Sequence, residues 1–207
     1  MTAIFARSGP PRAWVATLVC LLAAAVTGTA RAADAAAPAL YRLDPASGAL
    51  EFQFMQAGAQ NQGKFTKLTL TLAFSPDNPA AGKLDVLVEM ASADTGDKER
   101  DDTLKGVDLF AVARYPQAHF TSTQITKTAS GYDATGKLTL HGITREVHVP
   151  FSFRTADEPG GAVGYLQGKT TIRRLDFGVG QGDWKSTEWV GNDVAVSYSL
   201  RLVAGGH

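Results

Sequence analysis

Apolar and polar residues alternate over several long stretches of this chain. The period of two recurs in five segments, at residues 50–54, 68–74, 84–90, 147–153 and 194–202. Because successive side chains of an extended strand point to opposite faces, this period predicts strands with one apolar face and one wet face. We expect about eight such strands, mostly antiparallel.

Turn-forming residues separate the predicted strands. Residues 75–79 and 158–161 are rich in Pro, Gly and acidic or amide side chains, and we predict a hairpin connection at the first and a plain loop at the second. His141-Gly142 is predicted to form a turn, with Gly142 supplying a positive φ. Residues 178–182 are glycine-rich and predict a flexible loop.

One segment breaks the β pattern. Acidic residues follow Thr95 and precede Leu104, and Gly106 comes two positions after that leucine. This predicts a short helix or helical turn over residues 95–106 with Thr95 as its N-cap, because acidic side chains stabilise the first turn of a helix and glycine ends one. A second helical piece is predicted over residues 107–114.

The first 32 residues predict a secretory signal peptide. Arg7 and Arg12 precede an apolar run over residues 13–26, and Ala30-Arg31-Ala32 supplies small residues at a cleavage site. We predict cleavage after Ala32, export to the periplasm, and a disordered leader over residues 33–39. A single domain would then cover residues 40–204.

Charge and cysteine content narrow the functional classes. The whole chain carries 20 basic and 20 acidic residues, and the predicted signal peptide contains three arginines and no acidic residue, so the exported chain has a net charge of −3. With no basic run, nucleic acid is not expected as a partner. The only cysteine, Cys20, lies inside the predicted signal peptide, which leaves no disulfide, thiol nucleophile or thiolate metal ligand.

Few residues point to catalysis. The four histidines, His119, His141, His148 and His207, have no tight metal-ligand spacing. No nucleophile elbow, phosphate-binding loop or dinucleotide fingerprint is present. A hydrolase or isomerase that uses His141 or His119 with a carboxylate is an alternative hypothesis. The acidic run around residues 94–108 is interpreted as a solvated helix face, with Arg100 and Asp101 joining the helix to the barrel or contacting a head group.

The ordered motifs of the chain resemble those of the YceI-like family, bacterial polyisoprenoid-binding, lipocalin-like proteins. The resemblance covers nearly all of the chain from Tyr41 to about Val203. Its landmarks in order are Tyr41-Arg42-Leu43-Asp44-Pro45, Gly63-Lys64-Phe65, Arg100-Asp101 with Leu104, Asp108-Leu109-Phe110, Tyr115-Pro116, Ala118-His119-Phe120-Thr121-Ser122, the stretch from Gly136 to Arg145, and Arg174-Leu175-Asp176-Phe177-Gly178.

Two segments depart from the family pattern. Residues 54–59 lack the Lys and His that relatives often carry there, and Asp102-Thr103 stands where a second His is usual. If those side chains contact a head group in relatives, the head-group chemistry differs here. Residues 180–189 resemble a subgroup whose penultimate loop carries tryptophans.

The resemblance implies an all-β fold, an eight-stranded antiparallel lipocalin-like barrel with a short helical insertion. Alternation alone favours a barrel filled with side chains, whereas the resemblance implies a long apolar cavity. It also implies that the chain is a carrier, not an enzyme, and holds a polyisoprenoid or isoprenoid quinone without a covalent cofactor. Family members are often linked to stress conditions or to membrane cytochromes.

The predicted ligand-binding residues are the apolar side chains expected to face inward, or to lie near the open end. Trp184 and Trp189 are assigned to the mouth, since indole suits a surface that is apolar on one side and wet on the other. A membrane surface or a membrane cytochrome is an expected partner. A homodimer is also expected. A scaffold subunit of a membrane redox complex, with a filled barrel, is the other alternative. The predicted set is Phe52, Phe54, Leu70, Leu72, Phe74, Val86, Val88, Met90, Leu104, Phe110, Phe120, Leu138, Leu140, Val149, Phe151, Phe153, Phe177, Trp184, Trp189, Val196 and Tyr198.

Overall fold

The computed structural model of the chain describes residues 37–205. The predicted signal peptide, residues 1–32, and residues 33–36 of the predicted leader lie outside the described residues. Ala39, which the sequence assigns to the leader, instead belongs to the first strand and pairs with Phe74.

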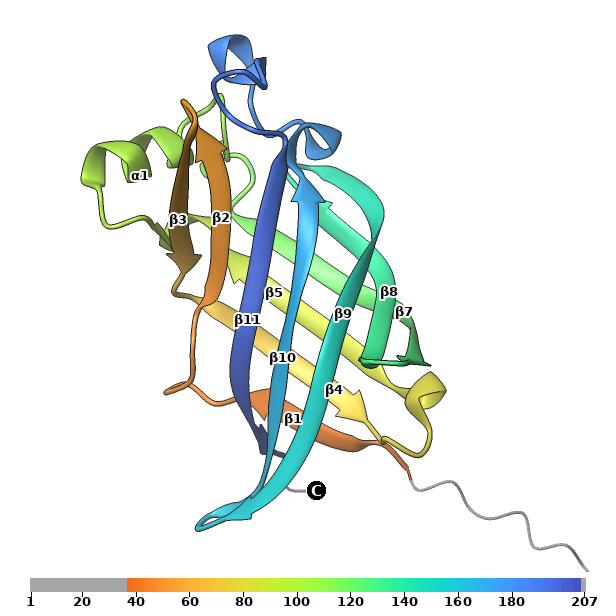
Figure 1. Cartoon of the computed structure of the whole chain (residues 1–207). Coiled ribbons are helices and arrows are strands. Elements are labelled where there is room, and N and C mark those ends of the chain that lie inside the picture. The colour runs from red at the N-terminus through yellow and green to blue at the C-terminus, as the bar shows by residue number, and fades with distance from the viewer. Residues whose placement is uncertain (1–36, 206–207) are drawn as a thin grey trace, which may run out of the picture. The chain divides into compact units, whose positions relative to one another are not determined.

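The described residues form one antiparallel sheet (Figure 1). Each strand buries the side chains on its inner face, as Leu70, Leu72 and Phe74 do while Thr69 and Thr71 stay exposed. The strands are β1 (Ala39–Leu43), β2 (Leu50–Gln56), β3 (Ala59–Phe65), β4 (Leu68–Phe74), β5 (Lys83–Glu89), β6 (Ala93–Asp94), β7 (Gln117–Thr128), β8 (Gly131–Leu140), β9 (Ile143–Glu158), β10 (Gly161–Arg173) and β11 (Asp193–Ala204).

Three pairs of short strands each behave as one long, interrupted strand. The first pair is β1 with β2, and both of these pair with β11. The second is β4 with β3: β4 pairs with β1, and β3 pairs with β2. The third is β5 with β6: β5 pairs with β4, and β6 pairs with β3. Counted so, the chain makes a closed eight-stranded antiparallel barrel whose strands follow one another in chain order. The predicted fold class is confirmed.

Two hairpin turns use residues in the left-handed backbone region. Ala57 and Gly58 have φ of 50° and 78°, and His141 and Gly142 have φ of 50° and 75°. Two successive positive φ values are what a type I′ turn requires, and its twist matches that of the flanking strands. The predicted turn at His141-Gly142 is confirmed. The segment 158–161 is a tight turn between β9 and β10, not a plain loop.

The helical insertion is α1 (Lys98–Lys105). Its N-cap is Asp97, whose carboxylate accepts a hydrogen bond of 3.0 Å from the N–H of Arg100, so the prediction of Thr95 was wrong. Thr95 instead donates its hydroxyl to the carboxylate of Asp101 at 2.7 Å, which fastens α1 to the segment before it. No helix within residues 37–205 is long and apolar enough to span a bilayer.

The second predicted helical piece, over residues 107–114, forms hydrogen-bonded turns but no helix. The reason is local, because Ala111 has a φ of 46°, which a right-handed helix cannot contain. The N–H of Ala111 bonds back to the carbonyl of Gly106 at 2.8 Å. The segment thereby folds down over the end of α1.

Aromatic rings fill one end of the barrel. The ring centroid of Phe74 lies 4.7, 5.7 and 5.3 Å from those of Tyr132, Phe151 and Phe153, at steep interplanar angles. Such edge-to-face contacts add to the hydrophobic gain of burial. We call this group the closed-end cluster; it consists of Tyr41, Leu72, Phe74, Tyr132, Phe151 and Phe153.

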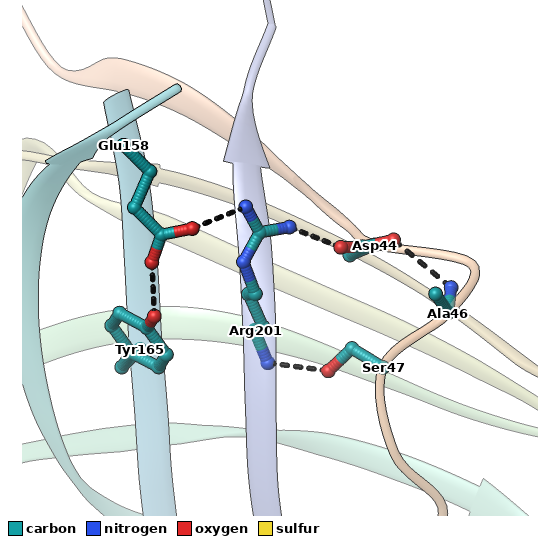
Figure 2. A network of polar contacts seen from close by, with 6 residues as sticks. All are labelled: Asp44, Ala46, Ser47, Glu158, Tyr165 and Arg201. Atoms are coloured by element: carbon teal, nitrogen blue, oxygen red, sulfur yellow. Dashed lines mark hydrogen bonds and ion pairs between the residues drawn. The ribbon is translucent and has the colours of Figure 1, made fainter. Parts of the chain in front are cut away.

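A polar network ties strands together outside the closed-end cluster (Figure 2). Arg201 on β11 forms ion pairs with Asp44, which follows β1, and with Glu158 at the end of β9, the latter at 2.8 Å. Tyr165 on β10 donates its hydroxyl to the same Glu158, and the backbone N–H of Arg201 donates to Ser47 Oγ at 2.6 Å. One arginine therefore joins segments that lie far apart in sequence.

The network lowers the pKa of both carboxyl groups. The backbone N–H of Ala46 and then the Arg201 guanidinium hold the pKa of Asp44 below its usual value. Hydrogen bonds from Tyr165 and then Arg201 do the same for Glu158. Carboxyl groups with a lowered folded pKa stabilise the fold above their ordinary pKa of roughly 4, and this contribution is lost as the pH falls through the folded value.

We therefore expect the melting temperature to fall as the pH is lowered below about 4, and Arg201→Met to weaken this dependence. The measurement is thermal unfolding followed by circular dichroism between pH 2 and 7. Lys67→Met, which removes the exposed pair of Lys67 with Glu89, is the matched control and should leave the curve unchanged. Identical curves for wild type and Arg201→Met would contradict the assignment.

Candidate ligand site

A cavity of about 750 Å³ lies inside the barrel. This volume falls within the roughly 300–1,000 Å³ of typical small-molecule sites. The closed-end cluster stops short of it: none of its six residues lines the cavity, and from the core around that cluster Phe120, Tyr198 and several aliphatic side chains reach the cavity wall. The expectation of a filled barrel, which alternation alone favoured, is therefore wrong.

Most of the predicted ligand-binding residues line this cavity. They come from seven strands of the barrel wall, from α1, and from the connecting segments that carry Met90, Phe110 and Trp184, and nearly all are apolar. They are Phe52, Phe54, Leu70, Val86, Val88, Met90, Leu104, Phe110, Phe120, Leu138, Leu140, Val149, Trp184, Val196 and Tyr198.

Four predicted site residues point inward but do not reach the cavity. Leu72, Phe74, Phe151 and Phe153 are part of the closed-end cluster, where opposite walls meet. The period of two assigned their direction correctly. The alternation cannot predict whether an inward side chain packs against one from the facing wall or borders an empty space.

Two further predicted residues also miss the cavity. Phe177 is buried with Leu109 and Val179 in a separate cluster that packs against Leu104 and Phe110. Trp189 is 65% exposed and lines a shallow hollow beside the cavity, together with Trp184. Only one of the two loop tryptophans therefore contributes to the cavity wall.

The structure adds wall residues that the sequence analysis did not select. Most occupy inward positions of the same alternating strands, so the signal that found their neighbours also marks them. Others come from loops, where no period exists to find them. The apolar additions are Leu50, Ala57, Phe65, Leu68, Leu84, Leu109, Ala118, Val147, Leu166, Ile172, Val179, Val190, Val194 and Leu200.

Polar lining residues gather at one end of the cavity. Gln56 and Asn61 come from the β2–β3 hairpin, and α1 with its N-cap supplies Asp97, Glu99, Arg100 and Thr103. Arg174 joins them from the segment after β10. Figure 1 shows α1 and the segment between β10 and β11 at the same end of the barrel. We call this end the mouth, bounded by the β2–β3 turn, α1 and residues 174–190.

The polar group deepest among the lining residues is already paired. Tyr198 donates its hydroxyl to the carbonyl oxygen of Pro150 at 2.5 Å, and burial, followed by the charge of Asp133, raises the pKa of the phenol. Gly168 makes room for this ring, since a Cβ there would lie 2.5 Å from it. Away from the mouth, the wall thus offers mainly hydrophobic contact.

The three histidines within residues 37–205 lie away from the cavity. His119 on the outer face of β7 bonds Asp85 at 3.0 Å, and His148 on β9 bonds Asp133 at 2.7 Å, which raises the pKa of the His148 imidazole. His141 packs in its turn against the ring of Tyr115, and burial lowers its pKa. Within residues 37–205, no three metal-ligating side chains come together. Among the described residues, the cavity wall therefore offers no histidine to the hydrolase or isomerase of the alternative hypothesis.

Fold and cavity together define a closed antiparallel barrel with one internal, mostly apolar site. The YceI-like domain family model matches residues 41–202, and the chain belongs to this family. A UPF0312 protein of Yersinia enterocolitica is 33% identical over 168 residues, covering 79% of this chain and 86% of that protein. Protein YceI of Escherichia coli is 37% identical over 119 residues, which cover 56% of this chain and 62% of that protein.

Solved structures show the same fold. BcnA of Burkholderia cenocepacia is 34% identical, with a TM-score of 0.69 over 77% of this chain and 98% of that protein. A polyisoprenoid binding domain from Saccharophagus degradans, implicated in plant cell wall breakdown, has a TM-score of 0.59 at 18% identity, over 81% of this chain and 99% of that domain.

The cavity predicts different costs for two leucines of one strand. Leu72 is fully buried in the closed-end cluster, whereas Leu70 ends at the cavity. Leu72→Ala should destabilise the ligand-free protein by about 2–5 kcal/mol, because it opens a new void. Leu70→Ala should cost clearly less, because its side chain already lacks packing partners on one side. Urea unfolding measures both, and equal costs would contradict an empty cavity at Leu70.

Proposed function

We propose that this protein binds one long-chain apolar lipid, an isoprenoid or an isoprenoid quinone, and acts as a periplasmic carrier and not as an enzyme. The observation that carries the proposal is the cavity itself: an apolar wall, closed by aromatic rings at one end and edged with polar side chains at the other. A ligand would place its chain toward the closed-end cluster and its polar end at the mouth.

The wall can supply enough affinity without strong polar contacts. A bound chain of about 30 heavy atoms, at roughly 0.3 kcal/mol each, would gain about 9 kcal/mol, which corresponds to a Kd somewhat below micromolar. The Saccharophagus degradans domain with the same fold is described as polyisoprenoid binding, which supports this class of ligand. The scaffold alternative assumed a filled barrel, and the cavity removes its premise.

Export and removal of residues 1–32 belong to the same proposal, since a carrier that serves the cell envelope has to reach it. The N-terminal pattern of the sequence supports this step. A homodimer is not part of the proposal, although β3 pairs with β6 at only two residues and the rest of its outer edge has no strand partner within the described residues.

Blocking the cavity tests the proposal. Val196 lines the cavity, and Val196→Trp should fill it without unfolding the barrel, because the new ring enters existing empty space. Organic extraction of the purified wild type, followed by mass spectrometry, should yield an isoprenoid or quinone that the variant lacks. Ser199→Trp, on the outer face of the same strand, should retain the lipid. Absence of any lipid in the wild type, with no binding of added isoprenoids, would refute the proposal.

The mouth is the face we assign to a membrane surface. Three large apolar side chains are exposed there or directly beside it: Met55 at 45%, Val107 at 78% and Trp189 at 65%. The loop of Val107 lies at the mouth because the N–H of Gln181 bonds the carbonyl of Asp108 at 2.7 Å. A poorly soluble lipid passes more easily from a bilayer into the cavity when these side chains touch the membrane.

Val107→Asp combined with Trp189→Asp should therefore slow lipid uptake from vesicles at least tenfold while leaving the equilibrium Kd nearly unchanged. Stopped-flow transfer of a fluorescent isoprenoid from vesicles measures the rate. Leu40→Asp is the matched control, because Leu40 is 39% exposed on β1, away from the mouth. If both variants slow transfer equally, the mouth is not the docking face, and a membrane protein such as a cytochrome becomes the donor to test.

A further inference from the structure

Arg174 is the one buried charged residue within residues 37–205, with 4% of its surface exposed. It begins a short 3-10 helix, Arg174–Phe177, directly after β10. Thr170 and Ile172 of β10 line the cavity, and Arg174 continues the same inward phase as the strand ends. Its side chain contributes to the cavity wall at the mouth.

The Arg174 guanidinium is held only by carbonyl oxygens. Nε donates to Gly191 at 3.0 Å, Nη1 to Val179 at 2.9 Å, and Nη2 to Val190 at 2.7 Å and to Ser186 at 3.4 Å. Carbonyls satisfy N–H groups but do not neutralise the charge. Within the described part of the chain, no carboxylate lies within ion-pair distance of this guanidinium. A buried charge without a counter-charge is costly.

The neighbouring residues show that this placement is specific. Arg173 is exposed to water and still forms an ion pair with the carboxylate of Asp176. Arg174 is buried and has no carboxylate partner among residues 37–205. Gly180 leaves space for the guanidinium, since a Cβ there would lie 1.9 Å from Nη1. The glycine-rich segment predicted to be a flexible loop is wrapped around Arg174, with Val179 buried beside it.

We propose that Arg174 supplies the counter-charge for an acidic head group, a phosphate or carboxylate, at the mouth end of the bound lipid. This rests on the proposed lipid-binding function. Nη1 carries two N–H groups, of which the Val179 carbonyl uses one, and a guanidinium binds phosphate and carboxylate oxygens strongly. The apolar wall would then select the chain, and Arg174 would select the charge at its end.

Two lipids with the same chain test this claim: geranylgeranyl phosphate and geranylgeraniol. Their binding can be followed through the fluorescence of Trp184, which lines the cavity, in a Trp189→Phe background. We expect this protein to bind the phosphate at least tenfold more tightly than the alcohol. Arg174→Gln should abolish the preference and keep the affinity for the alcohol. Arg173→Gln, which removes the same charge on the exposed side, should keep the preference.

Each outcome separates the head-group claim from the proposed function. Equal affinity for both lipids, or equal loss of preference in Arg173→Gln and Arg174→Gln, overturns the role of Arg174 but leaves lipid binding intact. Binding of neither lipid refutes the proposed function itself. Tight binding of inorganic phosphate alone, in a parallel titration, would assign the site to the free ion and overturn the lipid head group.

The pH dependence gives a second readout that needs no Arg174 variant. A phosphate monoester takes its second negative charge near pH 6. Affinity for geranylgeranyl phosphate should therefore rise between pH 5 and pH 7, while affinity for geranylgeraniol stays flat. This comparison decides the claim if Arg174→Gln fails to fold, and a flat profile for the phosphate would overturn it.

Discussion

Side-chain size, layer by layer along the barrel, decides whether facing walls meet. An eight-stranded barrel is wide enough for side chains to fill its interior or for one small ligand to occupy it. Where Phe74, Phe151, Phe153 and Tyr132 point inward, their rings span the width and pack edge to face. Where Leu70, Val149 and Val196 point inward, they leave about 750 Å³ between the walls. Every functional inference above depends on this difference.

The two ends of the barrel are built differently, and this gives the cavity a direction. Outside the closed-end cluster, the ion pairs of Arg201 join β11 to segments next to β1 and β9. At the mouth, polar side chains come from α1 and the β2–β3 hairpin, and Arg174 is buried among carbonyls. A lipid inserted with its chain inward meets mainly apolar wall along its length and most of the polar side chains at its end.

The amino-acid pattern predicted the strands, and the family resemblance predicted the barrel and a cavity, but neither predicted where that cavity ends. Alternation found β4, β9 and β11 and the inward direction of their side chains. It missed β3, whose sequence Ala-Gln-Asn-Gln-Gly-Lys-Phe is mostly polar because much of this hairpin is exposed. It could not separate Leu70 from Leu72, since both face inward and only the opposite wall decides which one meets a partner.

Loop geometry set the other limit. Trp184 and Trp189 looked equivalent in sequence, but only Trp184 turns toward the cavity. The burial of Arg174 had a detectable signal, because it continues the inward phase of Thr170 and Ile172, yet its carbonyl partners come from residues that only the folded loop brings close. The shift of the α1 N-cap to Asp97 is likewise a local choice between two capping side chains.

The most direct measurement of the central claim is a crystal structure of the protein as purified from its own cell envelope. The account predicts a continuous tube of electron density that starts at the mouth beside Arg174 and runs between Leu70, Val149 and Val196 toward Phe74. A cavity holding only ordered water, or side chains of facing walls packed together at Leu70, would contradict it.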